Sequence, residues 1–204
     1  MNEFDLKALT WDSNPMFIKR SKRISERIIA KIPLNIEMEA IEFGCGTGLI
    51  SFNLIPFIKS ITLADNSEGM LNVLNKKIKD YNIQNMEVIK TDLLEESLIN
   101  NKYDLIYTVL ALHHIEDVDN VLSKFYNMQK ENSYLCIADL DEEDGNFHGE
   151  NFAGHKGFSR IDLQNKLEIA GYKNIDVETC YEIKRKSEQG IENTYPVFLM
   201  TAEK

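Results

Sequence analysis

The sequence predicts an α/β protein: a seven-stranded, mostly parallel sheet between two layers of helices, with an antiparallel hairpin at one edge. Short apolar runs alternate with segments of helical periodicity along most of the chain. Such alternation, with strands that are apolar almost throughout, is typical of a parallel sheet covered on both faces. The last two apolar runs have no helix between them, so we expect them to pair antiparallel.

The strands are predicted from short apolar runs that end at turn residues. The first, "EAIEFG", closes at a glycine, and "SITLAD" and "MEVIKTD" each close at an aspartate. "YDLIYTVLAL" and "SYLCIADL" are the most apolar. The seven predicted strands span residues 39–44, 60–65, 86–92, 103–112, 133–140, 173–185 and 193–204.

The helices are predicted from apolar residues that recur every three or four positions. The first ends at Pro33, Ser67 can cap the third, and Gly171 can close the last. The predicted helices span residues 17–32, 48–57, 67–81, 118–129 and 159–172.

A length of 204 residues suits one well-buried core, so we expect a single domain over 1–204, with 1–33 as an N-terminal helical lid. The net charge is −10 at pH 7, which disfavours nucleic acid as a partner. The basic run "KRSKR" (19–23) is short and is interpreted as a solvated helix face. The oligomeric state is not predicted.

The three cysteines are far apart and form no CxxC pair, which is typical of reduced thiols. Neither a signal peptide nor a membrane span is recognisable. We therefore expect a cytoplasmic protein that does not associate with membranes.

A glycine-rich turn follows the first strand, in the stretch "AIEFGCGTGLIS". Gly44, Gly46 and Gly48 allow a tight turn and a close approach of a ligand to the backbone. In open α/β sheets, ligands bind at the carboxyl ends of the strands. Asp65 ends the second strand, 19 residues after Gly46, where an acid can bind ribose hydroxyls.

The spacing differs from that of a dinucleotide site, which is G-x-G-x-x-G rather than G-x-G-x-G. Glu42 precedes the turn, and a carboxylate beside a pyrophosphate is unfavourable. A cofactor with an ammonium or sulfonium group fits better. This argument favours S-adenosylmethionine over NAD, although a glycine turn without a ligand remains an alternative for the turn alone.

Four motifs in order resemble those of the class I S-adenosylmethionine-dependent methyltransferases: "IEFGCGTG", "LADNSEGM", "IKTDLL" and "YDLIYTVLALHHI". "WDSNP", "IADLDEEDGNFH" and "YPVFLMTAEK" further resemble a subset of small bacterial members whose substrate is unsettled. The resemblance covers essentially the whole chain. It implies a Rossmann-like three-layer sandwich and an enzyme that converts S-adenosylmethionine to S-adenosylhomocysteine.

The resemblance also implies roles for individual residues around the cofactor. Asp65 would accept the ribose hydroxyls, Glu42 would help to hold the amino group, and Asp92 would accept the adenine amine. The full set of implied cofactor-binding residues is Glu42, Gly44, Gly46, Gly48, Asp65, Asn66, Met70, Asp92, Leu93 and Thr108. Met70 could equally be a core residue of its helix.

Methyl transfer requires mainly that the acceptor be held in line with the sulfonium, and a base only where a proton must leave. His113 and His114 follow the fourth strand. Because adjacent residues of a regular element face different sides, we expect one of them, His113, to face the acceptor. The alternative is that the pair only organises the turn.

A long polar and aromatic connection, residues 139–158, follows the fifth strand. Such a length in a compact domain is usually functional. We expect Asp139 to take part in catalysis, and Asp141, His148, His155, His114 and Trp11 to line the pocket of a small-molecule acceptor. His148 and His155 with Glu150 fit no standard metal spacing, so we expect no metal site.

Two departures from the family pattern concern the acceptor side. The glycine pair that often precedes the fifth strand is absent from "QKENSYLCIAD", and Lys156 replaces the second of two adjacent histidines. The alternatives to a methyltransferase are an NAD-dependent oxidoreductase and a non-catalytic module that binds S-adenosylmethionine.

Overall fold

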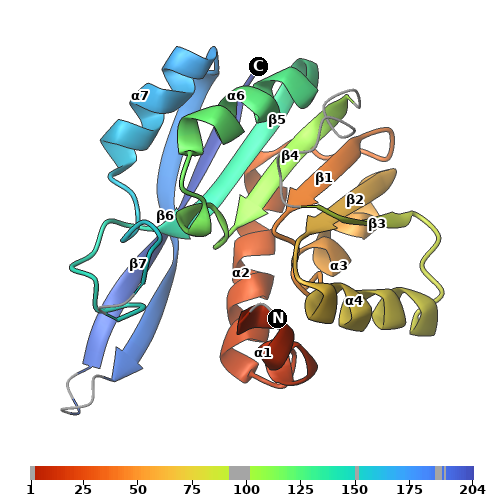
Figure 1. Cartoon of the computed structure of the whole chain (residues 1–204). Coiled ribbons are helices and arrows are strands. Elements are labelled where there is room, and N and C mark those ends of the chain that lie inside the picture. The colour runs from red at the N-terminus through yellow and green to blue at the C-terminus, as the bar shows by residue number, and fades with distance from the viewer. Residues whose placement is uncertain (1–2, 92–101, 150–151, 187–189, 191) are drawn as a thin grey trace.

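The computed structural model describes residues 3–91, 102–149, 152–186, 190 and 192–204, and these contain one seven-stranded sheet (Figure 1). Its strand order is β3-β2-β1-β4-β5-β7-β6. Only β7 runs antiparallel to its neighbours, β5 and β6, so the predicted fold class is confirmed. The strands are β1 (Glu39–Phe43), β2 (Ser60–Asp65), β3 (Met86–Lys90), β4 (Tyr103–Val109), β5 (Gln129–Leu140), β6 (Lys173–Lys186) and β7 (Glu192–Glu203).

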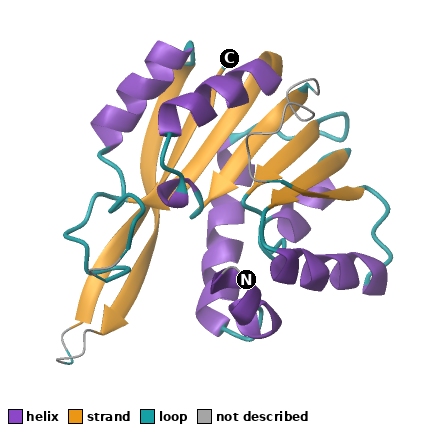
Figure 2. Ribbon diagram, in the orientation of Figure 1, coloured by secondary structure: helices purple, strands orange, loops and turns teal. Residues whose placement is uncertain are grey.

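Helices cover both faces of the sheet and create two apolar cores (Figure 2). One core joins the sheet to α2, α3 and α4, and the other joins it to α6 and α7. The helices are α1 (Glu3–Trp11), α2 (Pro15–Lys31), α3 (Ser51–Leu54), α4 (Glu68–Asp80), α6 (Val118–Met128) and α7 (Arg160–Ala170), with 3₁₀ turns η1 (Ile55–Phe57) and η2 (Leu112–His114).

Local capping explains where several helices begin and end. Asn14 accepts a hydrogen bond from the Met16 N–H, and Pro15 occupies the first turn of α2, where no N–H is needed. Ser67 caps α4 as predicted. Gly171 closes α7 with a left-handed φ of 107°, which is the C-terminal stop expected from the sequence.

Several element boundaries differ from the sequence prediction, and two of the differences have local steric reasons. The helix predicted over 48–57 is only α3 followed by η1, because Pro56 cannot continue the α-helical hydrogen bonds. β5 begins at Gln129 rather than at 133. Asn132 lies in this added part of β5 and has a left-handed φ of 59°. Asparagine tolerates this conformation better than most residues other than glycine.

The N-terminal segment packs beside α4 (Figure 1). The Asp5 carboxylate of α1 accepts hydrogen bonds from Ser67 Oγ at 2.7 Å and from the Gly69 N–H at 2.9 Å, which satisfies the amino end of α4. Asp12 likewise accepts from Thr47 Oγ1 and pairs with Lys77 at 2.7 Å. α1 is therefore tied to the start of α4, and Asp12, which follows α1, is tied to the glycine turn.

Within the described part of the chain, no helix has the length and apolar character that crossing a membrane requires.

Candidate active site

A cavity of about 820 Å³ opens at the carboxyl ends of β1, β2 and β4. Residues from the N-terminal helices, the glycine turn, η2 and the connection after β5 line it together. Of the residues singled out in the sequence, those lining the cavity are Trp11, Glu42, Gly44, Gly46, Asp65, Asn66, Met70, His113, His114 and His148.

The three glycines of the turn differ in which neighbouring atoms a side chain at each position would meet. All have positive φ, at 69° for Gly44, 52° for Gly46 and 79° for Gly48. A Cβ on Gly44 would lie 2.4 Å from Ala111 Cβ, and one on Gly48 would lie 2.7 Å from Leu74 Cδ1. A Cβ on Gly46 would meet nothing within 4 Å. Gly44 and Gly48 therefore serve packing, whereas Gly46 borders the open cavity.

Asp65 ties the glycine turn to the end of β2. One carboxylate oxygen accepts the Gly46 N–H at 2.7 Å and the other accepts the Ser67 N–H at 2.8 Å. A carboxylate offers about four lone-pair positions, so acceptor capacity remains for a ligand. Burial raises the pKa of Asp65 above its ordinary value, and the N–H donors of Ser67, Gly46 and Asn66 oppose that rise.

Glu42 is the last residue but one of β1 and is almost fully buried, with 2% of its surface exposed. In the register of the sheet it faces Tyr107 of β4, and Ser51 Oγ donates to it while bonding the Tyr107 hydroxyl. Burial raises the pKa of Glu42 to about 8, although the bond from Ser51 opposes the rise. This buried carboxyl therefore gains from a cation brought beside it.

In the strand order β2-β1-β4-β5, Asp65 and Glu42 lie at the β2 and β1 end of the cavity, and three histidines lie at the β4 and β5 end. His113 and His114 lie on η2, and His148 lies on the connection after β5; all three line the cavity. The expectation that only one of the adjacent pair faces it is wrong. η2 is a tight 3₁₀ turn that follows Leu110, whose φ is 52°, so strand alternation does not apply there.

Asp139 lies behind His113 rather than on the cavity wall. It has no exposed surface, and its Oδ1 lies 2.6 Å from His113 Nδ1. Its other oxygen accepts the His113 N–H at 3.2 Å. The two residues predicted as catalytic are therefore in direct contact, with Asp139 orienting the imidazole.

Burial and the neighbouring charge of His113 lower the pKa of both remaining histidines to about 4. The rings of His114 and His148 are therefore neutral at pH 7. Phe152 stacks on His148 with 3.9 Å between ring centroids, which fixes the orientation of that ring.

Several predicted residues lie outside the cavity. Asp141 forms a two-bond ion pair with Arg160, at 2.6 and 2.7 Å, so its carboxylate is already engaged. His155 packs on Phe158 and donates its N–H to the His113 carbonyl at 2.7 Å. Thr108 is buried and does not line the cavity, whereas the three residues that follow it, Val109–Ala111, do. Asp92 and Leu93 lie outside the described residues, as does Glu150.

Two arginines that line the cavity were not singled out in the sequence. Arg20 of α2 belongs to the basic run interpreted as a solvated face, and that interpretation is wrong for this residue. Burial lowers its pKa to about 10. Arg185 of β6 lies over the Phe147 ring at 3.7 Å and donates to the Phe147 carbonyl. Neither forms an ion pair with a described carboxylate. The cavity thus has an acidic and a basic region.

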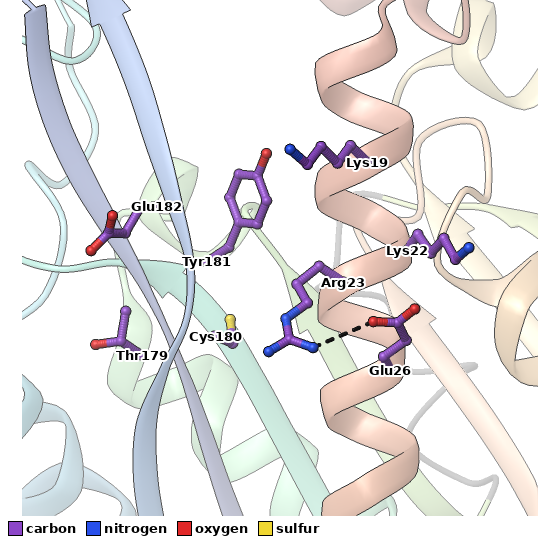
Figure 3. A pocket seen from close by; sticks show the side chains of 8 residues that line it. All are labelled: Lys19, Lys22, Arg23, Glu26, Thr179, Cys180, Tyr181 and Glu182. Carbon is purple, nitrogen blue, oxygen red and sulfur yellow. Dashed lines mark hydrogen bonds and ion pairs between the residues drawn. The ribbon is translucent and has the colours of Figure 1, made fainter.

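A second hollow of about 530 Å³ lies between α2 and β6 (Figure 3). Lys19, Lys22, Arg23 and Glu26 of α2 line it, and Arg23 pairs with Glu26 at 3.4 Å. Cys180 on β6 is buried, and burial raises its thiol pKa to about 12, which favours the protonated thiol over the nucleophilic thiolate at pH 7. No predicted site residue lines this hollow, and the candidate active site is the larger cavity.

The family assignment agrees with this geometry. Residues 34–185 match the model of the family described as "Methyltransferase domain". The chain belongs to this family, and its fold is that of the class I S-adenosylmethionine-dependent methyltransferases.

Among curated proteins, a Schizosaccharomyces pombe protein described as an uncharacterized methyltransferase is 31% identical over 156 residues, which cover 69% of this chain and 55% of that protein. The malonyl-[acyl-carrier protein] O-methyltransferase of Calditerrivibrio nitroreducens is 26% identical over 153 residues, covering 70% of this chain and 54% of that one. This chain thus spans about half the length of these relatives.

Solved structures support the fold. A Haemonchus contortus phosphoethanolamine N-methyltransferase 2, in complex with phosphomonomethylethanolamine and S-adenosylhomocysteine, superposes with a TM-score of 0.76 at 12% identity, over 100% of this chain and 60% of that one. A Bacillus halodurans methyltransferase superposes with a TM-score of 0.73 at 15% identity, over 87% of this chain and 97% of that one.

Proposed function

We propose that this chain transfers the methyl group of S-adenosylmethionine to a small-molecule acceptor. The observation that carries the proposal is one continuous cavity with Glu42 and Asp65 at one end and three histidines at the other. A volume of about 820 Å³ falls within the range of roughly 300–1,000 Å³ that ligand pockets occupy.

The acidic end suits the cofactor. Asp65 keeps lone pairs for the ribose hydroxyls, and Gly46 leaves room for the ligand against the backbone. Asn66 and Met70 line the same end. Glu42 would bind the cofactor's ammonium group, directly or through water, and the ammonium would favour the ionised carboxylate. A pyrophosphate would gain no such pairing and would oppose the ionisation of Glu42, and this supports S-adenosylmethionine rather than NAD.

S-adenosylmethionine also carries a carboxylate. Arg20 of α2 lines the cavity and lies over the Phe17 ring, and it forms no ion pair with a carboxylate in the part of the chain that the structure describes. We assign Arg20 to that carboxylate. The assignment has a direct check, because 5′-methylthioadenosine lacks the amino-acid group. Arg20→Met should weaken S-adenosylhomocysteine binding and leave 5′-methylthioadenosine binding unchanged.

The histidine end suits the acceptor. An acceptor atom held in line with the sulfonium attacks the methyl carbon, and its new bond to carbon forms as the carbon–sulfur bond breaks. His113, oriented by Asp139, is the candidate base where the acceptor must lose a proton. His114, His148 and Trp11 would contact the acceptor, with α1 and α2 acting as the lid that excludes water.

The acidic net charge of −10 supports a small molecule rather than a nucleic acid as acceptor.

The three cysteines are unpaired and buried, which supports a cytoplasmic location.

The proposal is tested by incubating the chain with methyl-labelled S-adenosylmethionine and a panel of hydroxyl, thiol, amine and carboxyl acceptors. We expect S-adenosylhomocysteine to form with at least one class, and to form far more slowly in the Asp65→Ala variant. Cofactor binding without turnover on any acceptor would support the non-catalytic alternative, and failure to bind millimolar S-adenosylmethionine would remove the proposal altogether.

A further inference from the structure

The three histidines at the acceptor end form a group with the dimensions of a metal site. Each offers one ring nitrogen, and these nitrogens all lie within 4.8 Å of one another. His113 Nε2 lies 3.0 Å from His148 Nε2. Tetrahedral zinc with bonds of about 2.0–2.1 Å to imidazole holds neighbouring nitrogens roughly 3.4 Å apart, which is a few tenths of an ångström from this distance.

Asp139 fixes which nitrogen of His113 is available. Its carboxylate accepts from Nδ1 at 2.6 Å, so Nδ1 carries the proton and the lone pair lies on Nε2. That nitrogen faces His148. A buried carboxylate behind a histidine is the usual outer support of a metal ligand, because it fixes the tautomer and strengthens the imidazole as a donor.

The positions of the other two rings are also fixed by packing. Phe152 stacks on His148, and His114 meets the edge of the same phenylalanine with 5.2 Å between centroids. Around the group, Asp139 and Glu3 bring negative charge and Arg185 brings positive charge near His148. His114 and His148 are open to the cavity, so a cation can enter without unfolding the site.

We propose that His113, His114 and His148 bind a divalent transition metal, with zinc as the first candidate, at the acceptor end of the cavity. Imidazole nitrogens suit zinc, cobalt, nickel and copper better than magnesium or calcium. Three protein ligands leave a fourth position open toward the cavity, as in catalytic rather than structural zinc sites. This departs from the sequence expectation of no metal, and it makes His113 a ligand rather than a base.

The role of the metal rests on the proposed function. A hydroxyl or thiol of the acceptor would bind at the open position and lose its proton to water, because a bound cation lowers the pKa of its ligand. The resulting anion attacks the methyl carbon of the sulfonium. The bond from oxygen or sulfur to carbon forms, the carbon–sulfur bond of the cofactor breaks, and its electron pair stays on the sulfur of S-adenosylhomocysteine.

The test is a titration of the untagged, chelator-treated chain with Co²⁺, followed by visible absorption. We expect one equivalent to bind with the intense bands of a tetrahedral site. His148→Ala should weaken binding at least 100-fold. The matched control is His155→Ala, which removes the one histidine outside the group and should leave binding unchanged.

Asp139→Asn tests the positioning role, since asparagine preserves the shape of the buried side chain. We expect Co²⁺ affinity to fall about 10–100-fold and the absorption bands to shift, which a purely structural role would not produce. Absence of tetrahedral bands in the wild-type chain, or equal binding by His148→Ala, would overturn the metal site.

The two proposals fail in distinguishable ways, because Co²⁺ binding needs no cofactor. A chain that binds S-adenosylhomocysteine but no Co²⁺ overturns only the metal site. S-adenosylhomocysteine binding and thermal unfolding of His148→Ala, both expected to match the wild-type chain, establish that the variant is folded.

Discussion

The two ends of the cavity are built in different ways. The cofactor end consists mainly of two short stretches, residues 42–46 and 65–70, in which the backbone and one carboxylate do most of the positioning, with Arg20 of α2 added from a distant part of the chain. The acceptor end gathers side chains from α1, α2, η2, β6 and the connection after β5. The first end depends on local conformation and the second on the long-range packing of the whole domain. Substitutions should therefore separate cofactor affinity from acceptor chemistry.

The largest expected effect is at the cofactor end. Asp65→Ala removes the carboxylate that would bind both ribose hydroxyls, and a hydrogen bond to a charged group contributes roughly 1.5–3 kcal/mol. We expect S-adenosylhomocysteine affinity to fall about 100-fold in calorimetric titration. Asp80→Ala, at the exposed end of α4, is the control and should not change it. A change of less than threefold in Asp65→Ala would contradict the role assigned to this end.

The glycine turn offers a matched pair of substitutions. Gly46→Ala and Gly48→Ala share the strain of a positive φ, about 1–2 kcal/mol. Only Gly48→Ala also crowds Leu74, and overpacking costs about 1–3 kcal/mol more. Chemical denaturation should show the larger loss of stability in Gly48→Ala. Gly46→Ala should instead lose about tenfold in cofactor affinity, roughly 1.4 kcal/mol. The reverse order would show that the cavity is not where the ligand binds.

Glu42 predicts a pH dependence. Burial raises its pKa from 4.5 to about 8, so the folded chain retains a proton that the unfolded chain loses above pH 4.5. The contribution to stability is complete below that pH and is lost as the pH rises toward 8. The ligand-free chain should become less stable over this interval, and Glu42→Gln should flatten the dependence. Denaturation at several pH values measures it.

Cofactor binding should reverse the preference of Glu42. The cofactor's ammonium favours the ionised carboxylate, so binding at pH 7 should release a proton. Titrations in buffers of different ionisation enthalpy detect this release, with Glu42→Gln as control. Asp65, Lys77 and Tyr107 also interact electrostatically with Glu42, so the comparison with Glu42→Gln isolates the proton that Glu42 itself releases. Equal proton release by the wild-type chain and Glu42→Gln would show that a group other than Glu42 releases the proton.

The smallest expected effect is on cofactor affinity in a variant of the acceptor end, where we expect almost no change. His148→Ala lies at the acceptor end, so it should alter S-adenosylhomocysteine affinity by less than twofold while acceptor turnover falls. Parallel binding and turnover measurements compare the two. A large loss of cofactor affinity in this variant would show that the two ends are coupled, against the separation argued above.

The difference between local conformation and long-range packing also explains what the sequence could and could not predict. The strand runs, the caps at Ser67 and Gly171 and the turn at Gly44–Gly48 all depend on neighbouring residues, so their patterns were recognisable. The direct contact of His113 and Asp139 depends on β4 pairing with β5, which only the strand order supplies.

Residues that depend on long-range packing were harder to predict because their environment is not local. Arg20, which we assign to the cofactor's carboxylate, stands in a run of basic residues. Only the packing of α2 against the cavity distinguishes it from the exposed basic residues beside it. Asp141 looked available because nothing nearby in sequence pairs with it, yet Arg160 meets it across the connection. The grouping of His148 with His113 and His114 has one sequence signal, which is that both segments follow the carboxyl ends of predicted strands. That these two strands, β4 and β5, are neighbours is known only from the structure.

The most direct test of the central claim is a calorimetric titration of the wild-type chain with S-adenosylhomocysteine, run beside an identical titration with NAD. The account predicts saturable one-to-one binding of S-adenosylhomocysteine and no heat of binding with NAD at the same concentration. Comparable binding of NAD, or no binding of S-adenosylhomocysteine at millimolar concentration, would contradict it.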